Sequence, residues 1–158
     1  MAADRINLID FERGWLNELI PMWRASFENG VGITDPHPLA DQLRYFVDEV
    51  EPRNTIRLAL RDGALVGFVA ASRVSIAQLY VRVGFQHQGI GAALLRWAKM
   101  QSAGHLWLHT FERNRRACAF YEKHGFVVAA RGFEPMWQLE DVRYEWCAPG
   151  AGTEAPTK

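Results

Sequence analysis

The stretch LYVRVGFQHQGIGAALL, residues 79–95, determines the fold that we expect for this chain. Four of its first five residues are apolar, aromatic or β-branched, and the polar Arg82 fits the alternation of a strand. The segment QHQGIG, residues 86–91, then turns into an apolar helix. Free backbone N–H groups and the helix dipole attract anions to such a helix N-terminus, and Gly89 and Gly91 let a phosphate approach the backbone. The stretch therefore predicts a strand–turn–helix unit with an anion site at the turn.

Three interpretations of this turn compete. A strand-to-helix connection that contains glycines needs no ligand at all. A dinucleotide site of the G-x-G-x-x-G type would need a third glycine where Leu94 stands, and it usually follows a first strand, whereas this turn lies mid-chain. A pyrophosphate cradle of the form Q-x-x-G-x-G matches Gln86, Gly89 and Gly91.

A second motif supports the pyrophosphate cradle. Residues 114–126 read NRRACAFYEKHGF, which matches the pattern N-x-x-A-x-x-F-Y-x-K-x-G-F. With the first motif on an apolar strand and this one downstream, the sequence resembles the GNAT superfamily of acetyl-CoA-dependent N-acetyltransferases. The two motifs cover roughly the second half of the chain, and the first half shows only a compatible architecture.

The resemblance implies an α/β (α+β) fold, with a mixed, mostly antiparallel sheet of about seven strands flanked by about four helices. By the same resemblance, two central strands splay apart and the cofactor enters the gap. Pro21 should kink or divide the first helix, and Asp62-Gly63 predicts a tight hairpin. We expect helices at residues 11–27, 39–50, 89–103 and 114–124, and strands at residues 6–9, 55–61, 65–72, 76–83, 106–111, 126–131 and 142–146.

Length and composition set the outer limits. A chain of 158 residues predicts one domain, which we place at residues 1–148, followed by a disordered tail at residues 149–158. A formal net charge of zero argues against a nucleic-acid partner, and no apolar run is long enough to span a membrane. Two cysteines without metal-ligand spacing, and no secretory signal, indicate a cytoplasmic protein without a bound metal. We expect a monomer or a homodimer.

The resemblance implies that the chain binds acetyl-CoA. Backbone amides of residues 86–92 would bind the pyrophosphate, and the main chain of residues 79–83 would pair with the pantetheine arm as an extra strand would. By match, Tyr80 or Val81 supplies an N–H group to the thioester oxygen. The expected cofactor contacts are Leu79, Tyr80, Val81, Val83, Gln86, His87, Gln88, Gly89, Ile90, Gly91, Ala92, Asn114, Tyr121 and Lys123.

Two residues are candidates for proton transfer. Tyr121 stands where the superfamily keeps a tyrosine near the sulfur, and a phenol is a competent donor to a leaving thiolate. Without the motif, a helix tyrosine that packs its ring on the sheet would be the simpler interpretation. His109 is a candidate general base, because histidine titrates near neutral pH, although a histidine in an apolar strand is more often structural.

The acceptor side has no motif. Trp23 and Phe27 lie on an aromatic stripe of the first helix, which predicts core packing or one wall of an acceptor pocket. Glu28 follows them and is a candidate acceptor contact. The segments 23–37 and 132–141, which could face the acceptor, mix aromatic with acidic residues, and this mixture suits a cationic amine with an apolar portion or an ordinary loop surface equally well. These residues are Phe27, Phe133, Trp137, Glu28, Asp35, Glu134, Glu140 and Asp141.

Two functions from different classes follow from these observations. One is an N-acetyltransferase that moves an acetyl group from acetyl-CoA to a primary amine of a small molecule or protein, by direct attack in a ternary complex. The alternative is a non-catalytic acyl-CoA-binding or sensing module on the same fold. A degenerate binder would often lose the tyrosine or the second glycine, and both are present.

Overall fold

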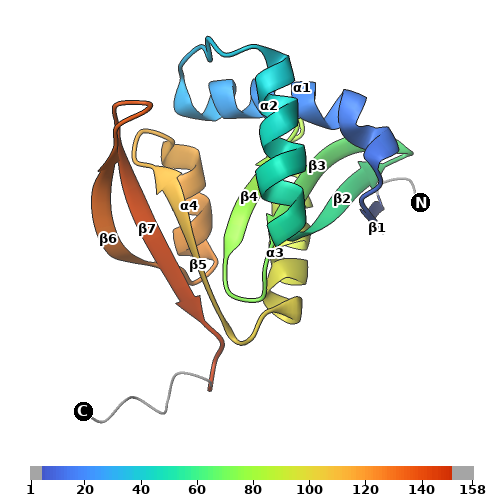
Figure 1. Ribbon diagram of the computed structural model, residues 1–158. Coiled ribbons are helices and arrows are strands. Elements are labelled where there is room, and N and C mark those ends of the chain that lie inside the picture. The colour runs from blue at the N-terminus through green and yellow to red at the C-terminus, as the bar shows by residue number, and fades with distance from the viewer. Residues whose placement is uncertain (1–4, 151–158) are drawn as a thin grey trace.

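The structure is a computed structural model that describes residues 5–150. Within these residues, seven strands form two antiparallel sheets, and four α-helices cover them (Figure 1). The predicted fold class is confirmed. Residues 151–158 of the predicted tail lie outside the described residues, so its disorder stays a prediction.

The first sheet has the strand order β1-β2-β3-β4. Asp62 and Gly63 join β2 to β3 with φ angles of 53° and 81°, so both residues of the predicted tight turn take left-handed backbone. Glycine and aspartate tolerate this conformation better than most residues. The strands are β1 (Ile6–Asp10), β2 (Thr55–Arg61), β3 (Ala64–Ala71) and β4 (Ile76–Val81).

The second sheet has the order β5-β7-β6, with β7 in its centre. Strands β6 and β7 are longer than predicted, because their register continues beyond residues 131 and 142 to the pair Glu134 and Leu139. The strands are β5 (His105–Phe111), β6 (Val127–Glu134) and β7 (Leu139–Cys147).

The two sheets meet at one end only. Ser75 forms an isolated parallel bridge with Trp107, whose N–H donates to the carbonyl of Val74 at 3.0 Å. Beyond this point β4 and β5 do not pair, and Figure 1 shows them approaching at the bottom of the view and separating above. The splay leaves one edge of β4 open.

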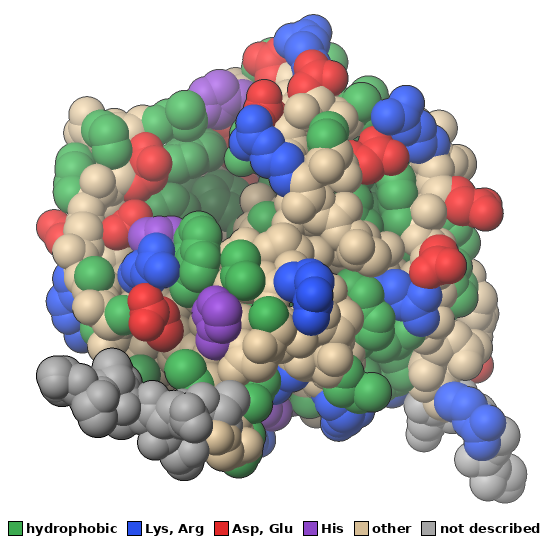
Figure 2. Space-filling view, turned by 60° about the horizontal axis from the view of Figure 1, so that its bottom comes forward, with side chains coloured by type: hydrophobic (Ala, Val, Ile, Leu, Met, Phe, Trp, Pro, Cys, Tyr) green, Lys and Arg blue, Asp and Glu red, His purple; other side chains and the backbone are tan. Residues whose placement is uncertain are grey.

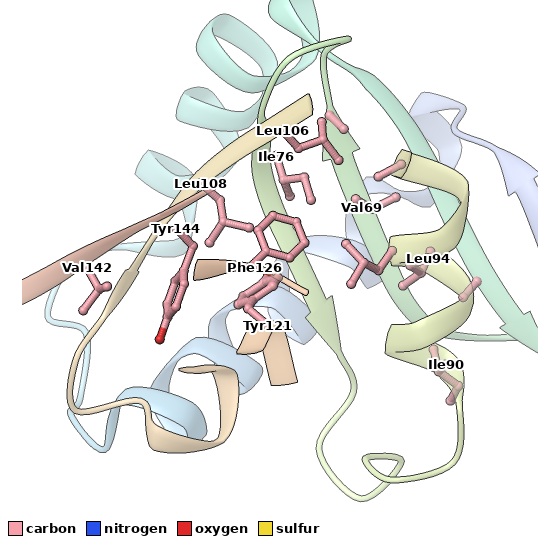
Figure 3. Close-up of a cluster of buried hydrophobic side chains, with 14 of the residues drawn as sticks. Val69, Ile76, Ile90, Leu94, Leu106, Leu108, Tyr121, Phe126, Val142 and Tyr144 are labelled. Carbon is pink, nitrogen blue, oxygen red and sulfur yellow. The ribbon is translucent and has the colours of Figure 1, made fainter. Parts of the chain in front are cut away.

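Four helices lie in two pairs, and each pair packs with its own hydrophobic core. The helix α1 (Leu16–Val31) and the π-helical turn η2 (Phe46–Val50), which continues α2 (Leu39–Tyr45), pack against β2 and β3 around Leu19, Trp23, Phe46 and Phe68, which are buried. The helices α3 (Ile90–Gln101) and α4 (Arg115–Lys123) pack against both sheets through a second cluster, which Figure 3 shows with Tyr121, Phe126 and Tyr144 close together. This second cluster holds α4 against the second sheet beside the splay.

The first helix differs from the prediction. Pro21 lies inside it without dividing it, so that part of the prediction is wrong, whereas a kink at Pro21 stays a prediction. The helix also continues past residue 27 to Val31 and stops at Gly32, which takes φ 80° and donates its N–H to Glu28 at 2.8 Å. Gly30 therefore lies within the helix, where a Cβ would come 2.6 Å from the side-chain nitrogen of Asn114. This glycine permits α1 to approach α4.

The described residues contain no helix that is long and apolar enough to cross a membrane.

Candidate active site

The open edge of β4 presents unpaired backbone groups. Arg82 donates to the carbonyl of Val66 on β3 at 2.8 Å, and β4 pairs with β3 in the register Val81↔Gly67 and Tyr80↔Phe68. Hydrogen-bonded and non-hydrogen-bonded pairs alternate in an antiparallel ladder, so Tyr80 bonds to β3 while Leu79 and Val81 turn their N–H and C=O groups to the open edge. The hydroxyl of Ser26 in α1 donates to the Val81 carbonyl at 2.8 Å, which agrees with this orientation. Of the two predicted N–H donors, Val81 has the outward direction.

The turn after β4 forms the predicted helix N-terminus. His87 and Gly89 take positive φ angles of 65° and 85°, and the first hydrogen bond of α3 runs from Ala93 to the carbonyl of Gly89 at 3.0 Å. The N–H groups of residues 90–92 therefore have no partner within the helix. Gln86 does not reach outward in this structure, because its side-chain oxygen accepts from the N–H of Gly84 at 3.0 Å and holds the loop.

A first cavity, of about 540 Å³, lies between this turn, the open edge of β4 and helices α1 and α4. Its floor includes Gly91, where a Cβ would come 3.3 Å from the ring of Phe120. Arg116 in α4 donates to Asn29 in α1 at 2.9 Å and so ties the two walls together. Arg116, Lys123, His87 and His124 line this cavity without any acidic residue. The positive charges of Arg116 and Lys123 suit an anion.

The cavity brings together most of the predicted cofactor contacts. Leu79, Tyr80, Val81, Gln86, His87, Gly89, Gly91, Ala92, Asn114, Tyr121 and Lys123 line it. Three predicted contacts do not line it: Val83 is exposed, Gln88 bonds to Arg61, and the side chain of Ile90 is buried in the core. For these three residues only the backbone could take part.

Asn114 caps α4. Its side-chain oxygen accepts from the N–H of Ala117 at 3.1 Å, while its amide nitrogen faces Gly30 of α1. Asn114 also lines the cavity, so the cap and a ligand contact are compatible.

Tyr121 lies on α4 with only 6% of its surface exposed. Its ring contacts those of Phe126 and Tyr144 at centroid distances of 5.4 and 6.1 Å (Figure 3). Within residues 5–150 its hydroxyl has no hydrogen-bond partner. Burial raises the pKa of Tyr121 well above its ordinary value, and neighbouring Tyr80 and Cys118 raise it further. The phenol is therefore protonated at any physiological pH and can act as a proton donor.

A second cavity, of about 730 Å³, opens on the other side of the splay. It is lined by α1, the 32–38 loop, α2, β4, β5 and the β6–β7 turn, and its walls carry Trp23, Phe27, Tyr45, Phe111 and Trp137. Figure 2 shows a hollow of this character at the upper left, with hydrophobic walls and charged and histidine side chains around its rim. This cavity has the size of a small-molecule site.

The two cavities meet at the splay. Leu79, Tyr80, Asn114, Ala117 and Tyr121 line both of them. A ligand in the first cavity and a ligand in the second would therefore approach each other beside the open edge of β4 and the Tyr121 ring.

The three predicted acceptor contacts fall in different surroundings. Trp23 is 6% exposed and touches the rings of Phe46 and Phe68, so it belongs to the core and borders the cavity with one side. Phe27 faces the cavity and contacts Trp137 at 5.2 Å. Glu28 lines neither cavity, because its carboxylate accepts from the backbone N–H of Asp35 at 2.7 Å and fixes the loop.

Two histidines line the second cavity, each beside an aspartate. His109 on β5 is half exposed, and its Nδ1 lies 3.9 Å from Asp141 on β7. His37 in the loop after α1 has a closer partner, with Nδ1 2.7 Å from Asp35, which also pairs with Arg24 at 3.3 Å. Burial acts to raise the pKa of Asp35, but the hydrogen bonds from His37 and the charge of Arg24 outweigh it and lower that pKa.

Sequence reasoning missed several residues of this site. Ser26 reaches the β4 edge, and Asn29 and Arg116 close the first cavity. The helix period places residue 26 one turn after Met22 on the buried face of α1, which could have identified Ser26. Asn29 and Arg116 depend on how α1 and α4 pack, and no local pattern marks them. The described residues contain no cluster of metal-ligating side chains.

A family model described as the acetyltransferase (GNAT) family matches residues 16–126. The chain belongs to the GNAT acetyltransferase family. The match ends at Phe126, so strands β6 and β7, which contribute Trp137 and Asp141 to the second cavity, lie beyond the part matched by the GNAT model.

Individual proteins agree with this membership. A protein of Mycobacterium tuberculosis that is named an uncharacterized N-acetyltransferase is 32% identical over 87 residues, which are 49% of this chain and 56% of that relative. This chain thus matches little more than half the length of that relative. A second protein from the same organism, which is named a probable N-acetyltransferase, is 31% identical over 130 residues, 72% of each chain. The solved PaiA N-acetyltransferase of Thermoplasma acidophilum, in complex with coenzyme A, has a TM-score of 0.71 at 20% identity and covers 90% of this chain and 99% of its own, which shows the shared fold.

Proposed function

We propose that this GNAT protein is an enzyme that transfers an acetyl group from acetyl-CoA to a primary amine by direct attack in a ternary complex. The observation that carries the proposal is the meeting of two cavities at the splay between β4 and β5. One cavity suits an anion and the other suits an organic amine. Direct transfer requires both substrates to be held side by side, which can lower the barrier by several kcal/mol.

The residues of the first cavity fit acetyl-CoA. Its pyrophosphate needs N–H donors and positive charge, which the first turn of α3 and the side chains of Arg116 and Lys123 supply. Its pantetheine arm carries amides that match the outward backbone groups of Leu79 on the β4 edge. The coenzyme A complex of the Thermoplasma acidophilum protein, on the same fold, supports the assignment.

Bound acetyl-CoA would supply a thioester whose carbon accepts the amine and whose sulfur departs as a thiolate. We assign the N–H of Val81 to the developing negative charge on the thioester oxygen, since Val81 turns its N–H to the open edge. A donor of this kind typically stabilises a transition state by about 2.7–4 kcal/mol. Leu79 presents its backbone to the same edge and would hold the arm in line.

Tyr121 is the proposed general acid. It lines both cavities, has an unpaired hydroxyl and keeps its proton because burial raises its pKa. His109 is the proposed base that takes a proton from the incoming ammonium group, with Asp141 beside it to stabilise the charged imidazole. The amine then attacks as a neutral nucleophile, and its second proton goes to the departing sulfur.

The second cavity favours an enzyme over a non-catalytic acyl-CoA sensor. A sensor needs the first cavity alone, whereas the second cavity would have no role in it. Release of free coenzyme A thiol in the presence of acetyl-CoA and a panel of amines, with the acetylated product identified by its mass, tests the proposal. Binding of acetyl-CoA without thiol release above the amine-free rate for any amine would favour the sensor. A cytoplasmic location and a monomeric or homodimeric state stay predictions.

A further inference from the structure

The second cavity has walls that are aromatic on several sides. Phe27 from α1 contacts Phe111 from β5 at 6.2 Å and Trp137 from the β6–β7 turn at 5.2 Å. Trp23 and Tyr45 continue this surface toward α2, with ring centroids 6.5 Å apart. Aromatic faces bind apolar groups and also attract cations. The walls therefore suit a flat or bulky apolar body with a positive charge near it.

Most of the charged groups on these walls are already paired. Asp35 is held by Arg24 and His37, and Asp41 pairs with Arg44 at 3.3 Å. Glu134 accepts a hydrogen bond from the backbone N–H of Met136 at 2.5 Å. A cation that entered the cavity would have to compete with these existing partners.

Asp141 is the exception. Its side chain is 22% exposed and lines the cavity, and among residues 5–150 its carboxylate makes no hydrogen bond. The nearest positive candidate is His109, whose Nδ1 lies 3.9 Å away. On the neighbouring strand Gly132 leaves room for this carboxylate, since a Cβ there would come 2.8 Å from its oxygen. The carboxylate is thus held beside the proposed base without being neutralised.

The geometry points to a small hydrophobic monoamine, preferably one with an aromatic ring, as the acceptor, with its ammonium group at Asp141 and its apolar body against Phe27, Phe111 and Trp137. This inference rests on the proposed function, because it names the substrate class of the same site. A polyamine would need several free carboxylates, and an extended peptide would need an open groove in place of a cavity of about 730 Å³.

The chemistry balances with one acceptor nitrogen. The ammonium group loses one proton to His109, a C–N bond forms to the acetyl carbon, and the C–S bond breaks. Tyr121 donates its proton to the departing sulfur and takes up the second proton of the nitrogen. The products are the neutral amide, the free thiol of coenzyme A and one proton, which His109 releases to water.

The test compares 2-phenylethylamine and tryptamine with spermidine and a lysine-containing peptide. We expect kcat/KM for the aromatic monoamines to exceed that for spermidine and the peptide by at least about ten-fold. The reason is that contacts with the rings of Phe27, Phe111 and Trp137 add binding that the other two acceptors lack. In parallel, calorimetry measures the binding of 2-phenylethylamine and of its neutral analogue 2-phenylethanol to the protein saturated with coenzyme A.

Asp141→Asn should weaken 2-phenylethylamine binding by roughly ten- to a hundred-fold, the usual value of a hydrogen bond to a charged group. It should leave 2-phenylethanol and acetyl-CoA binding unchanged. Glu140→Gln is the matched control, because Glu140 is the exposed neighbour on the same strand and lines neither cavity. This variant should bind the amine as the wild type does.

The outcomes separate the two proposals. Binding of 2-phenylethylamine that depends on Asp141, without thiol release for any amine, would support the acceptor class and contradict the enzyme. Faster transfer to spermidine or the peptide would overturn the acceptor class and support the enzyme. Equal amine binding by Asp141→Asn and the wild type would also overturn the acceptor class.

Discussion

The hydroxyl of Ser26 donates a hydrogen bond of 2.8 Å to the carbonyl oxygen of Val81, across 55 residues of sequence. The bond fixes α1 against the open edge of β4 and occupies the carbonyl there. The N–H of Val81, which points to the same edge, has no strand partner. Val81 thus holds the first helix through its carbonyl group, while its N–H group points to the open edge beside the junction of the two cavities.

The first prediction concerns the anion cradle. Gly89→Glu should weaken acetyl-CoA binding by roughly a hundred-fold or more, because the new carboxylate repels the pyrophosphate from several N–H donors. Calorimetry measures the affinity. Gly63→Glu is a close control, since both glycines have similar positive φ angles, 85° and 81°, and neither Cβ would meet another atom within 4 Å. If both variants keep wild-type affinity, this turn is not the cradle.

The second prediction concerns Tyr121→Phe. Turnover should fall by about 10²–10⁴-fold, the usual contribution of a general acid, while acetyl-CoA affinity stays within a few-fold. Tyr144→Phe serves as the comparison, because Tyr144 packs on Tyr121 but its hydroxyl donates a hydrogen bond to the carboxylate of Glu122 at 2.7 Å. We expect the comparison variant to lose stability and to keep most of its turnover rate. Wild-type turnover in Tyr121→Phe, with chemistry rate-limiting, would assign Tyr121 to the core alone.

The third prediction separates two rings of α1. Phe27→Leu should raise the KM of the amine by roughly two- to ten-fold and leave that of acetyl-CoA unchanged, since it removes an aromatic contact from the second cavity only. Trp23→Ala should instead lower the free energy of unfolding by about 3–5 kcal/mol, because Trp23 fills the core. Steady-state kinetics and thermal melts distinguish them. A folded Phe27→Leu protein with unchanged amine KM would remove this ring from the acceptor site.

The fourth prediction concerns Asp35 and pH. The pKa of this carboxyl in the folded protein lies below its ordinary value of 3.8, so the unfolded state takes up the proton first as pH falls. The stabilisation from its pairing with Arg24 and His37 is thus fully present above pH 3.8 and lost as pH falls through the folded-state pKa. Asp35→Asn should lower the Tm at neutral pH, with a smaller difference from wild type at strongly acidic pH. A Tm difference that stays constant across this range would contradict the assignment.

Much of the fold was predictable because its signals are local. Asp62-Gly63 specifies its hairpin through two left-handed residues, and Gly89 and Gly91 mark the turn into α3. The predicted end of α1 was wrong because a glycine such as Gly30 often marks the end of a helix. Gly30 instead lies within α1 and leaves room for the side chain of Asn114, which is distant in the sequence. The partners of Asp141 and Ser26 depend on strand register and helix packing, which no local pattern encodes. The cofactor side, built on one strand–turn–helix unit, was therefore easier to anticipate than the acceptor side.

The central claim is that the reaction takes place where the two cavities meet, beside the open edge of β4. A crystal structure with acetyl-CoA and 2-phenylethylamine bound tests it most directly. The account predicts the acetyl oxygen within hydrogen-bond distance of the Val81 N–H, the sulfur beside the Tyr121 hydroxyl, and the amine nitrogen between the acetyl carbon and Asp141. An acetyl group that lies away from Val81 and Tyr121, with the pyrophosphate outside the turn at residues 86–92, would contradict it.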